Sequence, residues 1–205
     1  MDRLERRFGF LAAPGLPMFV AGMTAAVGLL GLFKPEFSDL LALYPPLVLR
    51  GQLWRVLSFL IVPPPTGPLW LALWVIFLYW CLAALETAWG DFKFTVFMAL
   101  GVLATAAGAM ATGAPFGNSI LILAAFLALA RLMPDQEILV MFVLPVKLRW
   151  LSVLAAVWIG LGLATGDLLT RAEILCGLTP YLLFFGTGHW RDARYAWRRW
   201  RGGYR

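Results

Sequence analysis

The stretch LWLALWVIFLYWCLAAL, residues 69–85, contains no charged side chain, and it decides the class of the protein. A helix rises 1.5 Å per residue, so about 20 apolar residues cross a hydrocarbon core about 30 Å thick. Similar stretches recur along the chain, which is 61% hydrophobic and only 14% charged. Soluble domains are nearer half apolar and a quarter charged. The sequence therefore predicts an integral membrane protein.

We predict an all-α fold, a polytopic bundle of six transmembrane helices forming one membrane domain over residues 1–189. The sixth helix is the least apolar, because Arg171 and Glu173 fall in its first turn, where they can reach the headgroups. A basic cytoplasmic tail, residues 190–205, follows this domain. The predicted spans are about 14–33, 68–86, 93–112, 115–132, 149–165 and 170–188.

The placement of positive charge predicts the orientation of the bundle. With both ends inside, the inner segments hold 13 of the 17 lysines and arginines, and the outer segments hold the other four, Lys34, Arg50, Arg55 and Arg171. Inner loops of membrane proteins carry this excess. We therefore expect an even number of spans and cytoplasmic termini. A composition rich in Ala, Leu, Arg and Trp favours a bacterial inner membrane.

The first connection, residues 34–67, is too apolar for a solvated loop and too often broken by proline for a span. Its residues 40–65 read LLALYPPLVLRGQLWRVLSFLIVPPP. We expect it to lie in the outer interface, where protein groups must satisfy its irregular backbone. Trp54 suits the interface, and the Arg55 guanidinium can bind several carbonyls. The apolar connection 134–148 is predicted to be a similar interfacial or re-entrant element on the inner side.

Several motifs in this chain resemble those of the rhomboid superfamily, which includes the rhomboid proteases and the Derlins. GQLWR at 51–55, followed by LSFL at 57–60, is similar to the Trp-Arg motif of the first loop. Further similar motifs follow in the family's order over roughly residues 45–190. The resemblance implies a six-helix rhomboid-like fold, with structural motif positions at Gln52, Trp54, Arg55, Glu86, Trp89 and Gly90. The other matching segments are Leu85-Glu86 with Phe94, Asn118-Ser119, Pro134-Asp135, Pro145-Val146-Lys147 and Trp150-Leu151.

The resemblance also implies where a protease of this family would hold its catalytic pair. The family's nucleophile lies in Gly-x-Ser-Gly on the fourth helix, and its histidine lies on the sixth. Here GNSI, residues 117–120, keeps Ser119 but replaces the second glycine by isoleucine. GLTPY, residues 177–181, places Leu178 or Thr179 at the histidine position. Neither side chain accepts a proton at neutral pH, so the resemblance implies a pseudoprotease without catalytic residues.

Other bases are poorly placed for Ser119. The one histidine, His189, follows Thr179 by ten residues, about 15 Å along a helix, whereas a general base must lie within about 3 Å of its proton or one water away. Glu86 lies near the cytoplasmic face. Asp167 and Glu173 are expected at the outer rim of the bundle, and the use of one of these carboxylates as an unusual base for Ser119 is an alternative that stays open.

Polar side chains inside the predicted bundle also have structural interpretations. Asn118 is expected to cap the fourth helix or to bond with Thr179. Glu86 is expected to reach the headgroups or to pair with Lys93 or Arg131. Trp54 and Arg55 are expected to clamp the first connection, with substrate contact as the alternative. The sequence contains no cluster of His and Cys residues, so we expect no bound metal and no cofactor.

The tail combines basic and aromatic side chains at helical spacing. On a helix they would form two stripes, suited to anionic lipid on the inner leaflet, where each arginine contributes about 1 kcal/mol. A cytosolic partner or ribosomal RNA is the alternative for this segment. The lipid-binding prediction covers Arg191, Arg194, Arg198, Arg201, Arg205, Trp190 and Trp197.

The function predicted from these observations is non-catalytic. The chain is expected to bind transmembrane clients or a membrane partner, in membrane-protein quality control as one role. The predicted partners are membrane lipids and transmembrane segments, with no nucleic acid, because the middle of the chain is neutral. Two alternatives stay open: an active intramembrane serine protease that uses Ser119 with an atypical base, and a structural subunit of a larger membrane complex.

Overall fold

The computed structural model describes residues 12–34, 36–65, 67–140 and 144–202, and these are mostly helical. Five of the described helices are long and apolar enough to cross a membrane. The chain is therefore an α-helical, polytopic integral membrane protein, as its composition predicts. The five are α2 (Leu16–Phe33), α6 (Pro68–Trp89), α7 (Asp91–Thr112), α9 (Leu148–Thr165) and the Leu168–Gly186 part of α10 (Leu168–Gly202).

The predicted span at 115–132 is shorter than expected. It is the helix α8 (Ser119–Leu132), whose 14 residues extend about 21 Å, less than a hydrocarbon core. The first four residues of the prediction, 115–118, form an irregular segment instead, because Gly113 ends α7 with a φ of 71° and the chain then passes Pro115. α8 thus begins below the level at which α7 ends.

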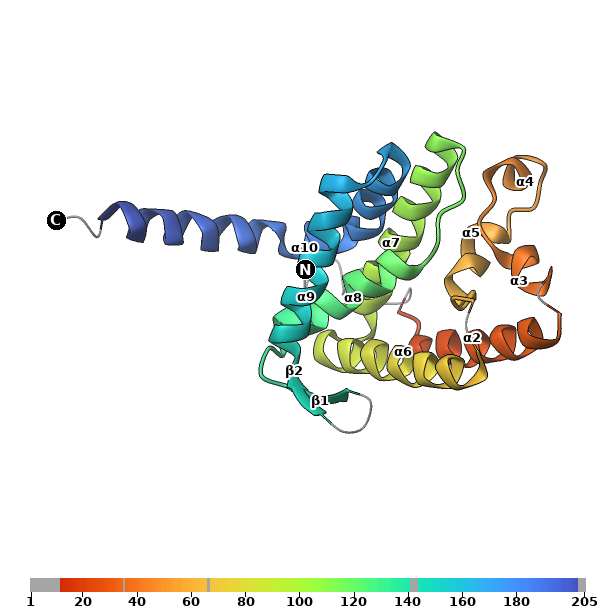
Figure 1. Cartoon of the computed structure of the whole chain (residues 1–205), viewed down its shortest axis with the longest axis horizontal. Helices are drawn as coiled ribbons and strands as arrows, with labels where there is room; N and C mark the ends of the chain where they lie inside the picture. The colour runs from red at the N-terminus through yellow and green to blue at the C-terminus, as the bar shows by residue number, and fades with distance from the viewer. Residues whose placement is uncertain (1–11, 35, 66, 141–143, 203–205) are drawn as a thin grey trace.

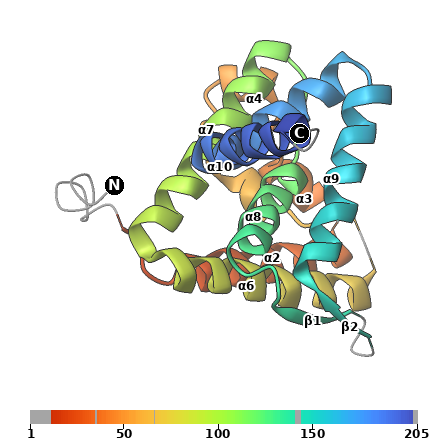
Figure 2. The same ribbon diagram turned by 90° about the vertical axis from the view of Figure 1, so that its left-hand side faces the viewer.

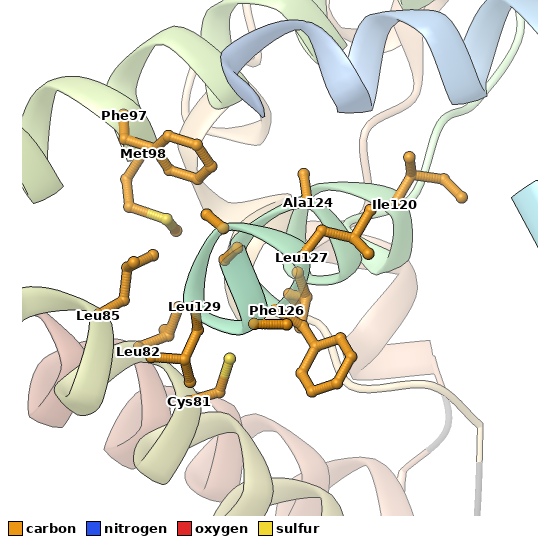
Figure 3. Packing of buried hydrophobic residues seen from close by; sticks show 14 of the residues in the cluster. Cys81, Leu82, Leu85, Phe97, Met98, Ile120, Ala124, Phe126, Leu127 and Leu129 are labelled. Carbon is orange, nitrogen blue, oxygen red and sulfur yellow. The ribbon is translucent and has the colours of Figure 1, made fainter. Parts of the chain in front are cut away.

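The short helix α8 is the centre of the bundle. Ten of its 14 residues are buried, and it packs against α6, α7, α9 and α10 (Figure 2). Figure 3 shows Leu129 of α8 near Cys81 and Leu82 of α6. α8 is buried on nearly all sides, which explains why its sequence is apolar all round. It is a core helix, surrounded by the helices that face lipid.

The helix α9 lies at the edge of this arrangement. It packs on α8 and α10, and of its residues only Leu148 and Ile159 are fully buried. Large apolar side chains cover the rest of its surface, which suits contact with lipid tails. The exposed ones are Trp150, Val153, Leu154, Val157, Trp158 and Leu161.

The first connection folds into a compact unit of short helices. These are α3 (Glu36–Leu41), α4 (Pro45–Leu49), α5 (Arg55–Ser58) and the 3-10 helix η2 (Phe59–Ile61). Figure 1 shows the unit at one end of the molecule, beside α2 and α7. Leu43 and Phe59 pack with Val102 of α7 in a second hydrophobic cluster. The connection is therefore an integral part of the fold, docked on the bundle.

The connection between α8 and α9 departs from the all-α prediction. It contains an antiparallel hairpin of β1 (Glu137–Val140) and β2 (Leu144–Lys147), in which Glu137 lies opposite Lys147. Asp135 pairs at the base of the hairpin with Arg149 at 3.4 Å and Lys147 at 3.9 Å. Apolar residues rich in β-branched side chains suit such short strands, so periodicity did not separate them from an interfacial helix.

The helix α10 continues without a break through the boundary predicted at residue 189, as far as Gly202. Its last part extends away from the bundle (Figure 1). The tail is therefore an extension of the last span. Pro180 lies inside this helix, and the binding of the tail to the leaflet stays a prediction.

Glycines allow the helices to approach closely at several crossings. A Cβ on Gly177 of α10 would lie 2.6 Å from Cγ2 and 2.7 Å from Cβ of Ile120 in α8. Gly108 of α7 lies in the same way against Cys176 of α10. Such close contacts drive helix association in lipid, where a hydrophobic force between helices is lacking. Gly160 of α9, by contrast, has nothing within 4 Å of a built Cβ.

We predict that Gly177→Ala lowers the free energy of unfolding in mixed micelles by about 1–3 kcal/mol, because the added methyl overpacks the α8–α10 contact. Gly160→Ala is the matched control and should be neutral or slightly stabilising, since alanine favours helices and its methyl meets open space. Equal effects of the two substitutions would contradict the close contact between Gly177 and Ile120.

Candidate functional site

The N-terminal end of α8 carries the polar residues that the sequence singled out. Asn118, directly before α8, is 5% exposed, and its Nδ2 donates to the carbonyls of Leu60 at 2.7 Å and Val62 at 3.0 Å. The expected bond from Asn118 to Thr179 is wrong, and its side chain does not cap α8 either. The Thr179 hydroxyl donates to the Leu175 carbonyl of its own helix at 2.9 Å.

The physical reason for this difference is the position of the first connection. Its end, at η2 and Val62, lies beside the start of α8, so the carbonyls of Leu60 and Val62 are within reach of Asn118. An amide with two donors pairs both of them there. A second link lies close by, where Leu43 forms an isolated antiparallel bridge with Phe116. Asn118 therefore fastens the first connection to the central helix.

A carboxylate from α10 reaches the same segment. Glu173 Oε1 accepts a hydrogen bond from the Gly117 N–H at 2.9 Å, between residues 56 apart in sequence. A negative charge near the start of α8 also suits the dipole of that helix. Glu173 thus bonds to the backbone of Gly117, which is two residues before Ser119 in the chain. The sequence suggested a rim carboxylate here but not this partner.

The other carboxylate that the sequence suggested as a base, Asp167, caps the start of α10. Its Oδ1 accepts the Thr170 N–H at 2.9 Å, at the start of that helix. Hydrogen bonds from the Thr170 side chain and backbone hold the pKa of Asp167 below its ordinary value. Asp167 is therefore ionised at neutral pH, and it acts as a helix cap.

Ser119 and Leu178, two positions that the sequence resemblance singled out, differ in their exposure. Ser119 is exposed in the first turn of α8, whereas Leu178 is buried in the main hydrophobic core. α10 is unbroken between Thr179 and His189, so about 15 Å of helix separates these two positions. The His189 side chain itself lies outside the described residues.

The second polar centre is Arg55 in the first connection. Only 3% of this residue is exposed. Its Nη1 donates to the carbonyls of Asp39 at 2.6 Å and Ala42 at 2.7 Å, and its Nε donates to Gln52 Oε1 at 2.7 Å. The guanidinium also lies 5.8 Å from the centre of the Tyr44 ring. Planar geometry with five donors allows one buried arginine to make all of these contacts.

Two neighbours of Arg55 complete the same set of bonds. Trp54 Nε1 approaches the Leu40 carbonyl at 3.4 Å, and the Ser58 hydroxyl donates to the Leu41 carbonyl at 2.8 Å. Together with Arg55, they meet four successive carbonyls, those of residues 39–42. These belong to the end of α3, where a helix leaves its last carbonyls without partners. Ser58 falls in the LSFL motif, but its role was not predicted.

The remaining motif residues lie at the inner end of α6. The Trp89 ring stacks on Phe184 at 5.1 Å and Phe185 at 5.5 Å, which joins α6 to α10. Gly90 follows with a φ of 81° and connects α6 directly to α7. A left-handed φ of this kind favours glycine.

Glu86 lies in the last turn of α6, half-buried. The Gly15 backbone and the Asp91 carboxylate lie near it. Gly15 precedes α2, so the start of that helix lies against the end of α6, a contact that the sequence did not indicate. The pairing of Glu86 with Lys93 or Arg131, or its reach to the headgroups, stays a prediction.

The described residues define a class of protein, a polytopic α-helical membrane protein with a short, polar-capped central helix. No group of three or more His, Cys, Asp or Glu within them could hold a metal ion. No protein-family model matches the chain, and no curated protein matches it either.

We predict that Arg55→Lys lowers the free energy of unfolding by about 2–3 kcal/mol, because an ammonium cannot replace the planar fork and buried carbonyls lose their partners. Arg50→Lys is the control, an exposed arginine of the same connection. Chemical denaturation in mixed micelles would measure both. If the two variants were equally stable, the carbonyls of residues 39–42 would not depend on the guanidinium.

Proposed function

We propose that this chain is a rhomboid-like membrane protein without protease activity, which binds transmembrane segments of other membrane proteins. The observation that carries the proposal is the commitment of the polar groups around Ser119 to the backbone. Asn118 bonds to Leu60 and Val62, and Glu173 bonds to Gly117. The arrangement that would activate a serine in this family is replaced by one that holds the fold together.

We propose further that α8 counts as a crossing, which gives six crossings and cytoplasmic termini. Three observations support this. α8 lies between helices long enough to span, the first connection closes its outer end, and the hairpin begins shortly after its inner end. A short helix at the centre of a bundle does not itself need to meet lipid along its whole length. A bacterial inner membrane fits the charge distribution.

The face of α9 is the surface that we propose for clients. It presents Trp150, Leu154 and Trp158 to the outside. Gly160, with open space around it, would let a second helix approach closely. On the side of α8 facing α6, Phe126 packs 5.9 Å from the Phe77 ring. A client helix could therefore meet an aromatic surface between α6 and α9. Such a role would suit membrane-protein quality control.

An active serine protease is the second candidate, and one observation favours it. Glu173, from a different helix, bonds to Gly117, which is two residues before Ser119. Its use as a base would require the carboxylate to leave the Gly117 N–H. A structural subunit is the third candidate, because the exposed face of α9 could equally hold one permanent neighbour.

We predict that a photo-crosslinking amino acid at Leu154 or Trp158, in native membranes, captures several different membrane proteins. The same group at Met18 of α2, also exposed to lipid, is the matched control and should capture fewer. Mass spectrometry of the adducts would identify them. Equal capture from both helices would contradict client binding by α9. One neighbour captured at fixed stoichiometry would support the structural subunit instead.

A further inference from the structure

The hairpin of β1 and β2 has two outer edges, and the backbone pairing shows which groups each edge presents. The Leu148 N–H donates to the Gln136 carbonyl at 2.9 Å, directly beyond the two strands. Because hydrogen-bonded and non-hydrogen-bonded pairs alternate along an antiparallel ladder, the pair of Leu139 with Pro145 is not hydrogen-bonded. Leu139 and Glu137 therefore direct their N–H and C=O groups away from β2, toward the free edge of β1.

The two edges differ in what they offer to another strand. Pro145 lies on the free edge of β2 and has no N–H to donate, a common way of closing an edge. On the free edge of β1, Glu137 and Leu139 each offer a donor and an acceptor. Among the described residues neither N–H has a hydrogen-bond partner. Unpaired groups of this kind are a template for strand addition, so β1 is the open edge of the hairpin.

The open edge is complementary to a second copy of itself. In an antiparallel pair of two β1 strands centred on Ile138, Glu137 of one copy lies opposite Leu139 of the other. Every outward N–H and C=O of these residues is then paired. The two Ile138 side chains meet in a close, non-hydrogen-bonded pair, and β-branched side chains are favourable in such positions. The contact is isologous and closes with two copies, because Pro145 blunts both outer edges of the joined sheet.

The orientation of the hairpin also suits two copies in one membrane. Ile138 packs against the main hydrophobic core, so one face of the hairpin lies on the bundle. The twofold axis of an antiparallel strand pair is perpendicular to the sheet, which places both bundles on the same face of the joined sheet. β2 leads directly into α9, a helix that can cross the membrane, and Figure 2 shows the hairpin at the periphery of the molecule. Copies inserted in the same direction therefore hold their β1 edges at the same depth.

We propose that two copies of this chain associate through β1, joining two two-stranded sheets into one antiparallel sheet with the strand order β2–β1–β1–β2. The partner is a second copy rather than an unrelated extended segment, because a second copy supplies a strand of matching length, register and depth. This inference does not depend on the proposed function, since the open edge lies on the hairpin and the proposed client surface lies on α9.

The first test is disulfide crosslinking in native membranes, with Cys81 and Cys176 both replaced by alanine. Ile138→Cys places two thiols across the twofold axis, where the Cα atoms of a non-hydrogen-bonded pair lie about 4.5 Å apart, within disulfide range. Val146→Cys is the matched control. It lies opposite Ile138 on the same face of the hairpin, but its two copies would be about 14 Å apart, across three strand spacings. We expect a mild oxidant to link Ile138→Cys into a dimer and to leave Val146→Cys monomeric.

The second test removes the outward donor alone. Leu139→Pro deletes an N–H that points away from β2, so the hairpin keeps its own hydrogen bonds. Leu139→Val keeps the N–H and is the matched control. We expect Leu139→Pro to weaken dimerisation at least about tenfold relative to Leu139→Val, because each copy loses a hydrogen bond to its partner. Energy transfer between labelled copies in liposomes of increasing lipid-to-protein ratio measures the affinity, and equal unfolding midpoints of the two variants would confirm an intact hairpin.

Three results would overturn the proposal. The first is the same extent of dimer crosslinking for Ile138→Cys and Val146→Cys, whether high or absent. The second is equal dimer affinity of Leu139→Pro and Leu139→Val. The third is linkage of Ile138→Cys to a different protein, because another chain would then occupy the edge. If Leu139→Pro lowers the unfolding midpoint, the crosslinking result decides alone, since Ile138→Cys keeps every backbone group.

Discussion

The fold depends on satisfying backbone carbonyls in a place where water is scarce. The first connection is irregular, apolar and docked on the bundle, and its carbonyls need partners from the protein. Arg55, with Trp54 and Ser58, donates hydrogen bonds to carbonyls at the end of α3. Asn118 donates hydrogen bonds to carbonyls at the end of η2. With both ends paired, the connection can pack Leu43 and Phe59 against α7. Stability here follows from a few buried donors, because each unpaired carbonyl would cost about 1–3 kcal/mol.

The same constraint determines what the centre of the molecule can do. α8 is short and buried, and its outer end is held by Asn118 from the first connection and by Glu173 from α10. Gly177 brings α10 against Ile120 just beside Ser119. These contacts use the polar groups near Ser119 for structure. The proposed binding function therefore places clients on the apolar surfaces outside this end, chiefly on α9.

Apolar length predicted most of the fold from the sequence. The bounds of α2, α6, α7 and α9 agree with the predicted spans within about three residues, because the hydrocarbon core fixes how long such a helix must be. The capping of carbonyls by Arg55 also followed from side-chain chemistry. The sequence did not indicate contacts that depend on the path of a distant segment. Asn118 bonds to the first connection instead of Thr179, and Glu86 lies against Gly15. Nothing local in the sequence indicates either contact.

The most direct measurement of the central claim is labelling of Ser119 by a serine-reactive fluorophosphonate in membranes. A serine whose neighbours are committed to the backbone has no base to take its proton. The account predicts that the wild type is labelled no more than Ser119→Ala. Labelling of the wild type that is lost in Ser119→Ala, and lost again in Glu173→Gln, would contradict it and establish a catalytic serine with a carboxylate base.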